Sequence, residues 1–210
     1  NLDAESIKPP RISEISGYIN HAALRLYRLI ENYLLYMQLE LVSHDREQQR
    51  ILKSGITANP SNAITDQAHH WVLNPHAPSR SREADLILEI GESKSIAIGE
   101  EYLNKIVEEL IDNACKFSAP DTPIKVEGKQ TDQGYNFSVS DQGIGMTAEQ
   151  IDTIDAYIQF DRNRMEQQGT GLGLAICRLL AELHGGTFTV VSEPEAGTTV
   201  KIFLPHAPKA

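Results

Sequence analysis

The first part of the chain carries an apolar repeat that is typical of one long helix. Apolar side chains recur alternately three and four positions apart, at Ile12, Ile15, Ile19, Ala22, Leu26, Leu29, Tyr33 and Tyr36. This spacing predicts a helix from residue 11 to residue 41, roughly 45 Å long. Because a second set of apolar residues widens the stripe, we expect the helix to pack against a partner helix. That second set is Ile30, Leu34, Met37 and Leu41.

From Ala84 onward the pattern changes between a period of two and a period near that of a helix. Runs with strand character occur at 85–91, 95–99, 123–129, 135–140, 186–192 and 198–205. Helical runs occur at 60–73, with Pro60 in the first turn, at 100–117 and at 172–183, and Thr147 to Gln150 has the form of a capping box that opens a short helix. Strands interleaved with helices predict an α/β two-layer sandwich. We therefore divide the chain into a helical region, 1–55, and an α/β domain, 56–210.

Composition and charge exclude several classes of protein. Hydrophobic residues make up 40% and charged residues 23% of the chain, as in globular proteins, and no apolar run approaches the roughly 20 residues of a membrane span. The net charge of -10 argues against nucleic-acid binding, which depends on neutralising phosphates. Cys115 and Cys177 lack any metal-binding spacing, which fits a cytoplasmic protein. The first residue does not resemble a natural start, and we expect the sequence to belong to a longer protein.

Three polar residues share one face of the predicted helix at 100–117. Glu109, Asn113 and Lys116 are four and three positions apart, so their side chains project on the same side. A carboxylate, an amide oxygen and an ammonium in a row are suited to a metal, a water and a phosphate. The alternative is an ordinary solvated helix face.

The segment DQGIGM directly follows the run at 135–140. Asp141 at a strand end can accept a hydrogen bond from an exocyclic amine. Gly143 and Gly145 allow the backbone to approach a planar ligand closely. The alternative is a simple turn.

The segment GTGLGL, 169–174, opens the helix at 172–183. Glycines before a helix leave backbone N–H groups exposed, and the helix dipole favours an anion there. The segment predicts a phosphate site, but it is neither a Walker motif nor a dinucleotide fingerprint.

Together these segments resemble the ATP-binding domain of sensor histidine kinases, which is of the Bergerat type. VEELIDNACKFS, DQGIGM, QGTGLGLAI and HGGTFTVVSEPEAGTTVKIFLP are similar to that family's N, G1, G2 and terminal blocks and lie within 84–205. QFDRNRM, with Phe160, resembles the F block of the family's lid. The stretch INHAALRLYRLIENYLLYMQLE resembles the second helix of the family's dimerisation and phosphotransfer bundle. The resemblance implies a mixed sheet with helices on one face, and ATP and Mg²⁺ as cofactors.

The resemblance also implies roles for single residues. Asn113 is expected to bind Mg²⁺, Lys116 to contact phosphate, Phe117 to line the nucleotide pocket and Asp141 to bind the adenine amine. The loop around the phosphates is expected to consist of Gly169, Thr170, Gly171, Leu172 and Gly173.

Further expected contacts lie at the edges of this site. Gly143 and Gly145 are expected to leave room for the base, Thr198 to reach it through water, and Arg162 to steady the terminal phosphate. Glu109 stands where many histidine kinases carry an amide, and it resembles the general base of hydrolytic members of the superfamily. It is expected either to act on the acceptor imidazole or to hold the metal through water.

The function implied is transfer of the γ-phosphoryl group of ATP to a histidine, and then to an aspartate of a response-regulator receiver domain. We expect a homodimer through the helix at 11–41, with no nucleic-acid partner. The acceptor motif of the family does not appear in the sequence. His21 is followed by Ala22 and Ala23 rather than by an acid, so we expect the acceptor to lie outside the sequence and the chain alone not to phosphorylate itself. Two alternatives are another ATPase or serine kinase of the same fold, and a non-catalytic ATP-sensing scaffold.

Overall fold

The computed structural model describes residues 9–73, 82–156 and 172–208. The chain begins with a long helix, α1 (Pro9–Ser43), which exceeds the predicted range by about one half-turn at each end. The short helix α2 (Arg46–Leu52) and then α3 (Pro60–Leu73) follow. Asp45 caps α2, since its Oδ1 accepts hydrogen bonds from the N–H groups of Glu47 and Gln48 at 2.9 and 3.1 Å.

A five-stranded sheet forms the centre of the domain that follows. Its strands are β1 (Leu86–Ile90), β2 (Ile124–Gln130), β3 (Gly134–Asp141), β4 (Thr187–Glu193) and β5 (Gly197–Pro205). They lie in the order β1-β2-β3-β5-β4. β1 is parallel to β2 and the other neighbours are antiparallel, so the sheet is mixed, as the family resemblance implied.

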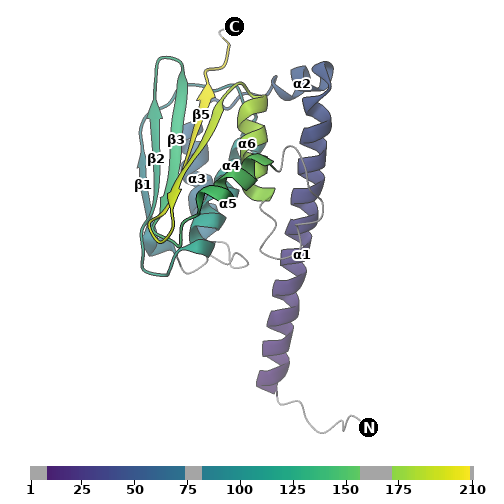
Figure 1. Cartoon of the computed structure of the whole chain (residues 1–210), viewed down its shortest axis with the longest axis vertical. Helices are drawn as coiled ribbons and strands as arrows, with labels where there is room; N and C mark the ends of the chain where they lie inside the picture. Colours follow the sequence, from purple (N-terminus) through teal and green to yellow (C-terminus); the bar gives the residue numbers. More distant parts are fainter. Residues whose placement is uncertain (1–8, 74–81, 157–171, 209–210) are drawn as a thin grey trace.

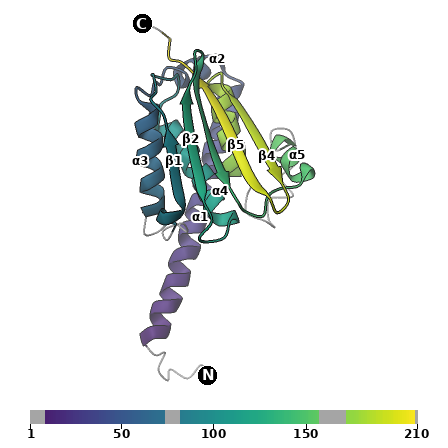
Figure 2. The same ribbon diagram turned by 90° about the vertical axis from the view of Figure 1, so that its left-hand side faces the viewer.

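Helices cover one face of this sheet. Besides α3, these are α4 (Glu100–Phe117) and α6 (Leu172–Leu183), while the short helix α5 (Ala148–Ala156) lies near the end of β4 (Figures 1 and 2). Along β2 and the first half of β3 buried side chains recur at alternate positions, because one face of the sheet meets the helices and the other meets water. The predicted α/β two-layer sandwich is confirmed.

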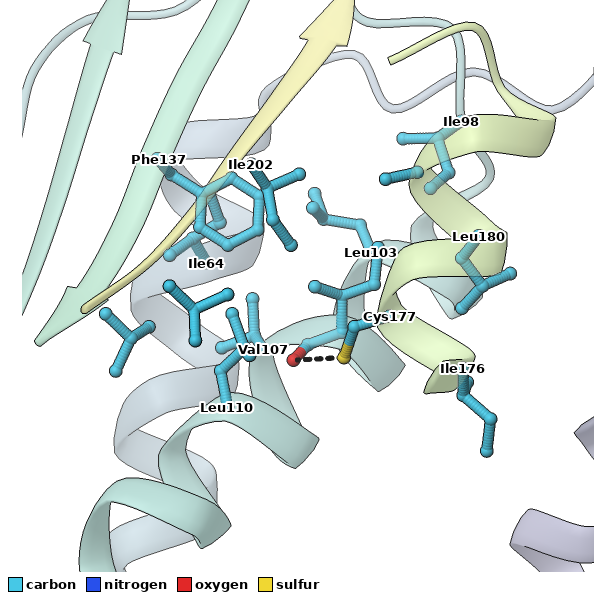
Figure 3. Close-up of a cluster of buried hydrophobic side chains, with 14 of the residues drawn as sticks. Ile64, Ile98, Leu103, Val107, Leu110, Phe137, Ile176, Cys177, Leu180 and Ile202 are labelled. Atoms are coloured by element: carbon cyan, nitrogen blue, oxygen red, sulfur yellow. Dashed lines mark hydrogen bonds between the residues drawn. The ribbon is translucent and has the colours of Figure 1, made fainter. Parts of the chain in front are cut away.

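The core lies between the sheet and helices α3, α4 and α6 (Figure 3). The apolar stripe of α4 is at most 2% exposed, at Leu103, Ile106, Val107, Leu110, Ile111 and Ala114. Phe137 and Ile202 of the sheet and Ile176 and Leu180 of α6 complete the cluster. Each large apolar side chain buried in this way contributes about 1.5–3 kcal/mol, so the stripe fixes which face of α4 is turned outward.

Helix α1 has two different faces. One face packs against α6 and makes polar contacts with α4, and Asn32, Tyr36, Leu39 and Val42 are buried on it. The other is exposed, and it carries most of the predicted seam, at Ile15, Ile19, Leu26, Leu29 and Tyr33. Assigning Tyr36 to a seam for a partner helix was therefore wrong. The N-terminal half of α1 projects beyond the sheet (Figure 1). None of the helices in the described ranges is long and apolar enough to cross a membrane.

Two local predictions had opposite outcomes. The capping box is confirmed, because Thr147 N donates to Gln150 Oε1 at 2.8 Å and Gln150 N donates to Thr147 Oγ1 at 3.3 Å. The strand predicted at 95–99 is wrong. Its Ile96 forms isolated bridges instead, to Thr57 on one side and to His206 on the other, so the segment connects the start of the domain to the end of β5 without joining the sheet.

Candidate functional site

Helix α4 carries the first group of predicted site residues. The side chain of Asn113 is half-buried and that of Lys116 is exposed, with Lys116 Nζ 4.8 Å from the centroid of the Phe117 ring. A cation over an aromatic face is a favourable contact. The carboxamide of Asn113 makes no hydrogen bond to the described residues, so those residues do not fix its orientation. Both side chains therefore lie where a ligand can reach them.

Glu109 does not lie on a solvated face, and that alternative is wrong for this residue. It is 8% exposed. Its Oε1 accepts from Lys105 Nζ at 2.7 Å and from Asn32 Nδ2 of α1 at 3.0 Å. The paired acids outweigh the effect of burial on Lys105, and the pKa of its ammonium is raised. The candidate acid is thus held by a cation of its own helix and by an amide of α1.

The other oxygen of Glu109 faces the start of α6. A Cβ added to Gly173 would collide with Glu109 Oε2 and would lie 3.7 Å from Asn113 Nδ2. A side chain at Gly173 would therefore require the Glu109 carboxylate to move. The end of the GTGLGL segment is therefore next to Glu109 and Asn113, as the predicted site requires. Gly169, Thr170, Gly171, Arg162 and Phe160 lie outside the described residues, and the side chain of Leu172 is in the core.

A polar junction of three helices lies beside Glu109. Arg28 of α1 pairs with Glu108 at 3.3 Å and with Asp112 at 3.5 Å, and its guanidinium lies 4.1 Å from the centroid of Trp71 of α3. Burial raises the pKa of both carboxyl groups, and Arg28 opposes this rise. Arg28 and Asn32 therefore bind α1 to the same helix that carries the candidate site.

The loop after β3 forms the second part of the site. Asp141 Oδ1 accepts from Gly143 N at 2.8 Å, and Ile144 N donates to the carbonyl of Phe117 at 3.1 Å. A Cβ on Gly143 would collide with that carbonyl. Gly145 has a φ of +65° and passes closely over the backbone of Glu193, where a side chain would not fit. The glycines thus seat this loop against the end of α4 and the β4–β5 turn.

Thr198 lies opposite Asp141 in the β3–β5 pair. Its hydroxyl is 2.9 Å from that of Ser192, which also accepts from Met146 N at 2.8 Å. Ser192 could not be predicted from the sequence, because a serine in an alternating strand is not distinguished from other polar residues. Thr198 and Ser192 connect β4 and β5 to the loop that carries Asp141.

The carboxyl group of Asp141 is half-buried, and burial raises its pKa. The N–H groups of Gly143 and Thr198 and the charge of Arg82 oppose the rise. On acidification Asp141 therefore takes up a proton at a higher pH than an exposed aspartate does. A protonated carboxyl is a weaker hydrogen-bond acceptor than a carboxylate. Binding of a ligand amine to this group therefore weakens as the pH falls.

The loop of Asp141 and the start of α6 at Gly173 are far from α4 in the sequence, but both lie against its last two turns, where Asn113 and Phe117 stand. One end of this line carries a carboxylate that can accept from an amine, and the other carries an amide, a lysine and a helix start. Such an arrangement, on a mixed sheet covered by helices, is suited to a nucleotide-binding α/β domain.

The chain belongs to the family of histidine kinase-, DNA gyrase B-, and HSP90-like ATPases, whose pattern matches residues 99–208. It is 32% identical over 127 residues to the phytochrome-like protein Cph1 of Synechocystis sp., covering 60% of this chain and 17% of that protein. It is 28% identical over 170 residues to the adaptive-response sensory kinase SasA of Synechococcus elongatus, covering 80% and 42%. The chain thus spans less than half the length of these relatives.

A solved structure shares the fold over nearly the whole chain. The histidine kinase AdeS of Acinetobacter baumannii superposes with a TM-score of 0.64 and 16% identity, covering 97% of this chain and 87% of that one. Because the match covers 97% of this chain, it includes the long helix α1 as well as the sandwich. The resemblance to histidine kinases drawn from the sequence is confirmed.

Proposed function

We propose that this chain is the ATP-binding catalytic part of a sensor histidine kinase, together with one helix of its dimerisation bundle. In the whole protein, the γ-phosphoryl group of ATP passes to a histidine on an acceptor helix and then to an aspartate of a response-regulator receiver domain. Residues 1–55 belong to the helical bundle and residues 56–210 to the catalytic domain. The observation that supports this most directly is the meeting of Asp141, Phe117, Asn113 and Gly173 along α4.

The adenine end of the site is the loop after β3. Asp141 accepts a hydrogen bond from the exocyclic amine, and Gly143 and Gly145 make room for the ring. Thr198 reaches the base through water, and Phe117 lines the pocket beside it. An ionised carboxylate favours adenine over guanine, because guanine presents a carbonyl oxygen, another acceptor, at the corresponding position.

The phosphate end of the site is the start of α6. Lys116 contacts phosphate, and the N–H groups of Gly169, Thr170, Gly171, Leu172 and Gly173 wrap around it, with Arg162 at the terminal group. Backbone donors at a helix start and the helix dipole both favour a phosphate. Phosphoryl transfer depends mainly on such positioning and on charge neutralisation.

The residues present fit Mg²⁺ held jointly by protein and nucleotide. Among the described residues there is no group of three or more His, Cys, Asp and Glu side chains that would enclose a metal. Mg²⁺ commonly keeps several waters and binds through one or two protein oxygens plus substrate phosphates. Asn113 supplies such an oxygen. When bound, the ion neutralises charge on the phosphates.

Glu109 has two candidate roles. As a catalytic residue it orients the acceptor imidazole or accepts its proton, and as a metal-shell residue it holds a water of the Mg²⁺. The contact of its Oε2 with the start of α6 supports both, because that is where the phosphates are expected. Lys105 and Asn32 both donate to Oε1 of Glu109, so Oε2 is the oxygen that remains available for either role.

The exposed face of α1 supports a homodimer. Ile15, Ile19, Leu26 and Leu29 remain between 41 and 64% exposed in the single chain. Leaving a large apolar side chain in water forfeits about 1.5–3 kcal/mol, so this face is suited to the same face of a second copy. The chain is proposed to act in the cytoplasm, where receiver domains and ATP are available.

A phosphorylation assay tests the proposed activity. The chain is extended at its N-terminus with its natural upstream segment, or mixed with an acceptor-helix protein, and incubated with labelled ATP and Mg²⁺. We expect phosphate on protein that is labile in acid and stable in base, as phosphohistidine is. Asn113→Ala is expected to abolish the label and Glu109→Gln to reduce it if Glu109 is catalytic.

The controls separate the alternatives. The chain alone is expected to bind ATP without labelling itself, and a label on His21 would contradict the assignment of α1. A serine kinase of the same fold gives acid-stable phosphate instead. An extended protein that binds ATP tightly but never acquires phosphate would favour the ATP-sensing scaffold.

A further inference from the structure

Arg82 is a buried charge that the sequence analysis did not single out. It is 4% exposed, and it lies just before β1, next to the short 3-10 helix at Glu83–Asp85. Its Nε pairs with the carboxylate of Asp85. Burying a guanidinium is costly unless its donors find partners, so the remaining contacts of Arg82 indicate what it is held there to do.

Those contacts converge on the C-terminal end of α4. Nη1 donates to the carbonyls of Cys115 and Ser118, both at 3.1 Å. Nη2 donates to Ser118 Oγ and to the carbonyl of Thr122, both at 3.1 Å. The last carbonyls of a helix lack partners within the helix and carry its negative dipole end, which a planar cation with several donors satisfies. Arg82 thus closes α4 and binds the loop at 118–122 to it.

Along the chain, the carbonyl of Phe117 lies between those of Cys115 and Ser118, which both accept from Arg82 Nη1. That same oxygen accepts from Ile144 N at 3.1 Å, and Gly143 passes so close to it that a side chain would not fit. The loop that carries Asp141 therefore rests on a turn of backbone whose position Arg82 sets. A shift of this turn moves Gly143 and Ile144, and with them the carboxylate that Gly143 N holds at 2.8 Å.

We propose that Arg82 is a positioning residue for the adenine end of the site: by holding the last turn of α4, it sets the position of the Asp141 loop. The inference rests on the proposed function, since it assumes that Asp141 binds a nucleotide base. The charge of Arg82 acts in the same direction, because it opposes the rise in the pKa of Asp141 and so keeps more of the carboxylate ionised.

The test compares Arg82→Gln and Arg82→Lys with the wild type, each made in the whole chain. Calorimetry gives the affinity for ATP and for GTP, and circular dichroism gives the thermal midpoint without nucleotide. We expect Arg82→Gln to weaken ATP binding about tenfold or more, because small displacements of a binding group have large effects. The preference for ATP over GTP is expected to fall as well. The acidic limb of ATP binding is expected to move to higher pH, because Asp141 loses a nearby positive charge.

Arg82→Lys separates charge from position. Lysine keeps the charge but cannot hold three carbonyls and a hydroxyl as a planar fork does. We therefore expect the acidic limb to return toward that of the wild type while ATP affinity stays reduced. If Arg82→Gln does not fold, Arg82→Lys alone tests the proposal through the same affinity and selectivity measurements.

Tyr135→Phe is the matched control for a general loss of stability. Tyr135 is fully buried at the start of β3, the opposite end of the strand from Asp141, and its hydroxyl lies 3.2 Å from Ser61 Oγ. We expect this variant to be less stable yet to keep its ATP affinity and its selectivity.

A folded Arg82 variant whose ATP affinity and ATP-over-GTP preference equal those of the wild type would overturn the inference. So would equal losses in the Arg82 and Tyr135 variants. A wild-type chain that does not bind ATP contradicts the proposed function instead, and the two failures are therefore distinct.

Discussion

Asp141→Asn is expected to weaken ATP binding by about 1–3 kcal/mol, the effect of losing a hydrogen bond to a charged group and leaving its partner unsatisfied. The geometry makes the direction clear. Asp141 Oδ1 already accepts from Gly143 N at 2.8 Å. Asparagine has one oxygen and one NH₂ group, so if the oxygen stays on Gly143, the NH₂ group meets the adenine amine donor to donor. The same variant is expected to bind GTP relatively better, because the NH₂ group can donate to the guanine oxygen.

Isothermal titration calorimetry with ATP and GTP measures both effects. Asp132→Asn is the matched control, because it makes the same chemical change at an exposed residue in the turn before β3. Equal ATP affinity and equal ATP-over-GTP preference in Asp141→Asn and Asp132→Asn would refute the role of Asp141 at the base.

Asn113→Ala is expected to remove the dependence of nucleotide binding on Mg²⁺ while leaving the fold intact. The substitution is compatible with the helix, because alanine is the strongest helix former and Asn113 is only half-buried on α4. What is lost is the amide oxygen proposed to bind the metal, and we expect the affinity for ATP with Mg²⁺ to fall to about that measured in a chelator.

Circular dichroism checks the fold of this variant, and calorimetry with and without Mg²⁺ checks the metal. Asn104→Ala provides a control on the same helix, about two and a half turns earlier. If Asn113→Ala is folded and binds Mg-ATP as tightly as Asn104→Ala does, then Asn113 is not the metal ligand.

The sequence predicts those parts of the fold that depend on neighbours along the chain. The buried stripe of α4 follows from its helical spacing, and all six of its members are at most 2% exposed. The capping box at Thr147 and Gln150 is likewise local, and both of its hydrogen bonds form. The segments of the site could be identified from the sequence, because glycines and acids directly before or after a predicted strand or helix are easy to recognise.

The sequence does not predict contacts between distant segments. Glu109 is buried because α1 packs beside α4 and places Asn32 Nδ2 3.0 Å from Glu109 Oε1. The residue pattern of α4 does not predict this contact. The spacing of apolar residues assigns Tyr36 to the exposed seam, but in the structure it is buried on the side of α1 that packs against α6. Arg82 gave no signal either, because its partners are backbone carbonyls, which every residue possesses.

The most direct test of the central claim is a calorimetric titration of the folded wild-type chain with ATP, in Mg²⁺ and in a chelator, with GTP as the comparison. The proposed function predicts saturable binding of ATP, tighter with Mg²⁺ than without it and tighter than the binding of GTP, with one nucleotide per chain. A folded chain that gives no binding heat or saturation with ATP and Mg²⁺, or that binds GTP equally well, would contradict an adenine site between Asp141 and the start of α6.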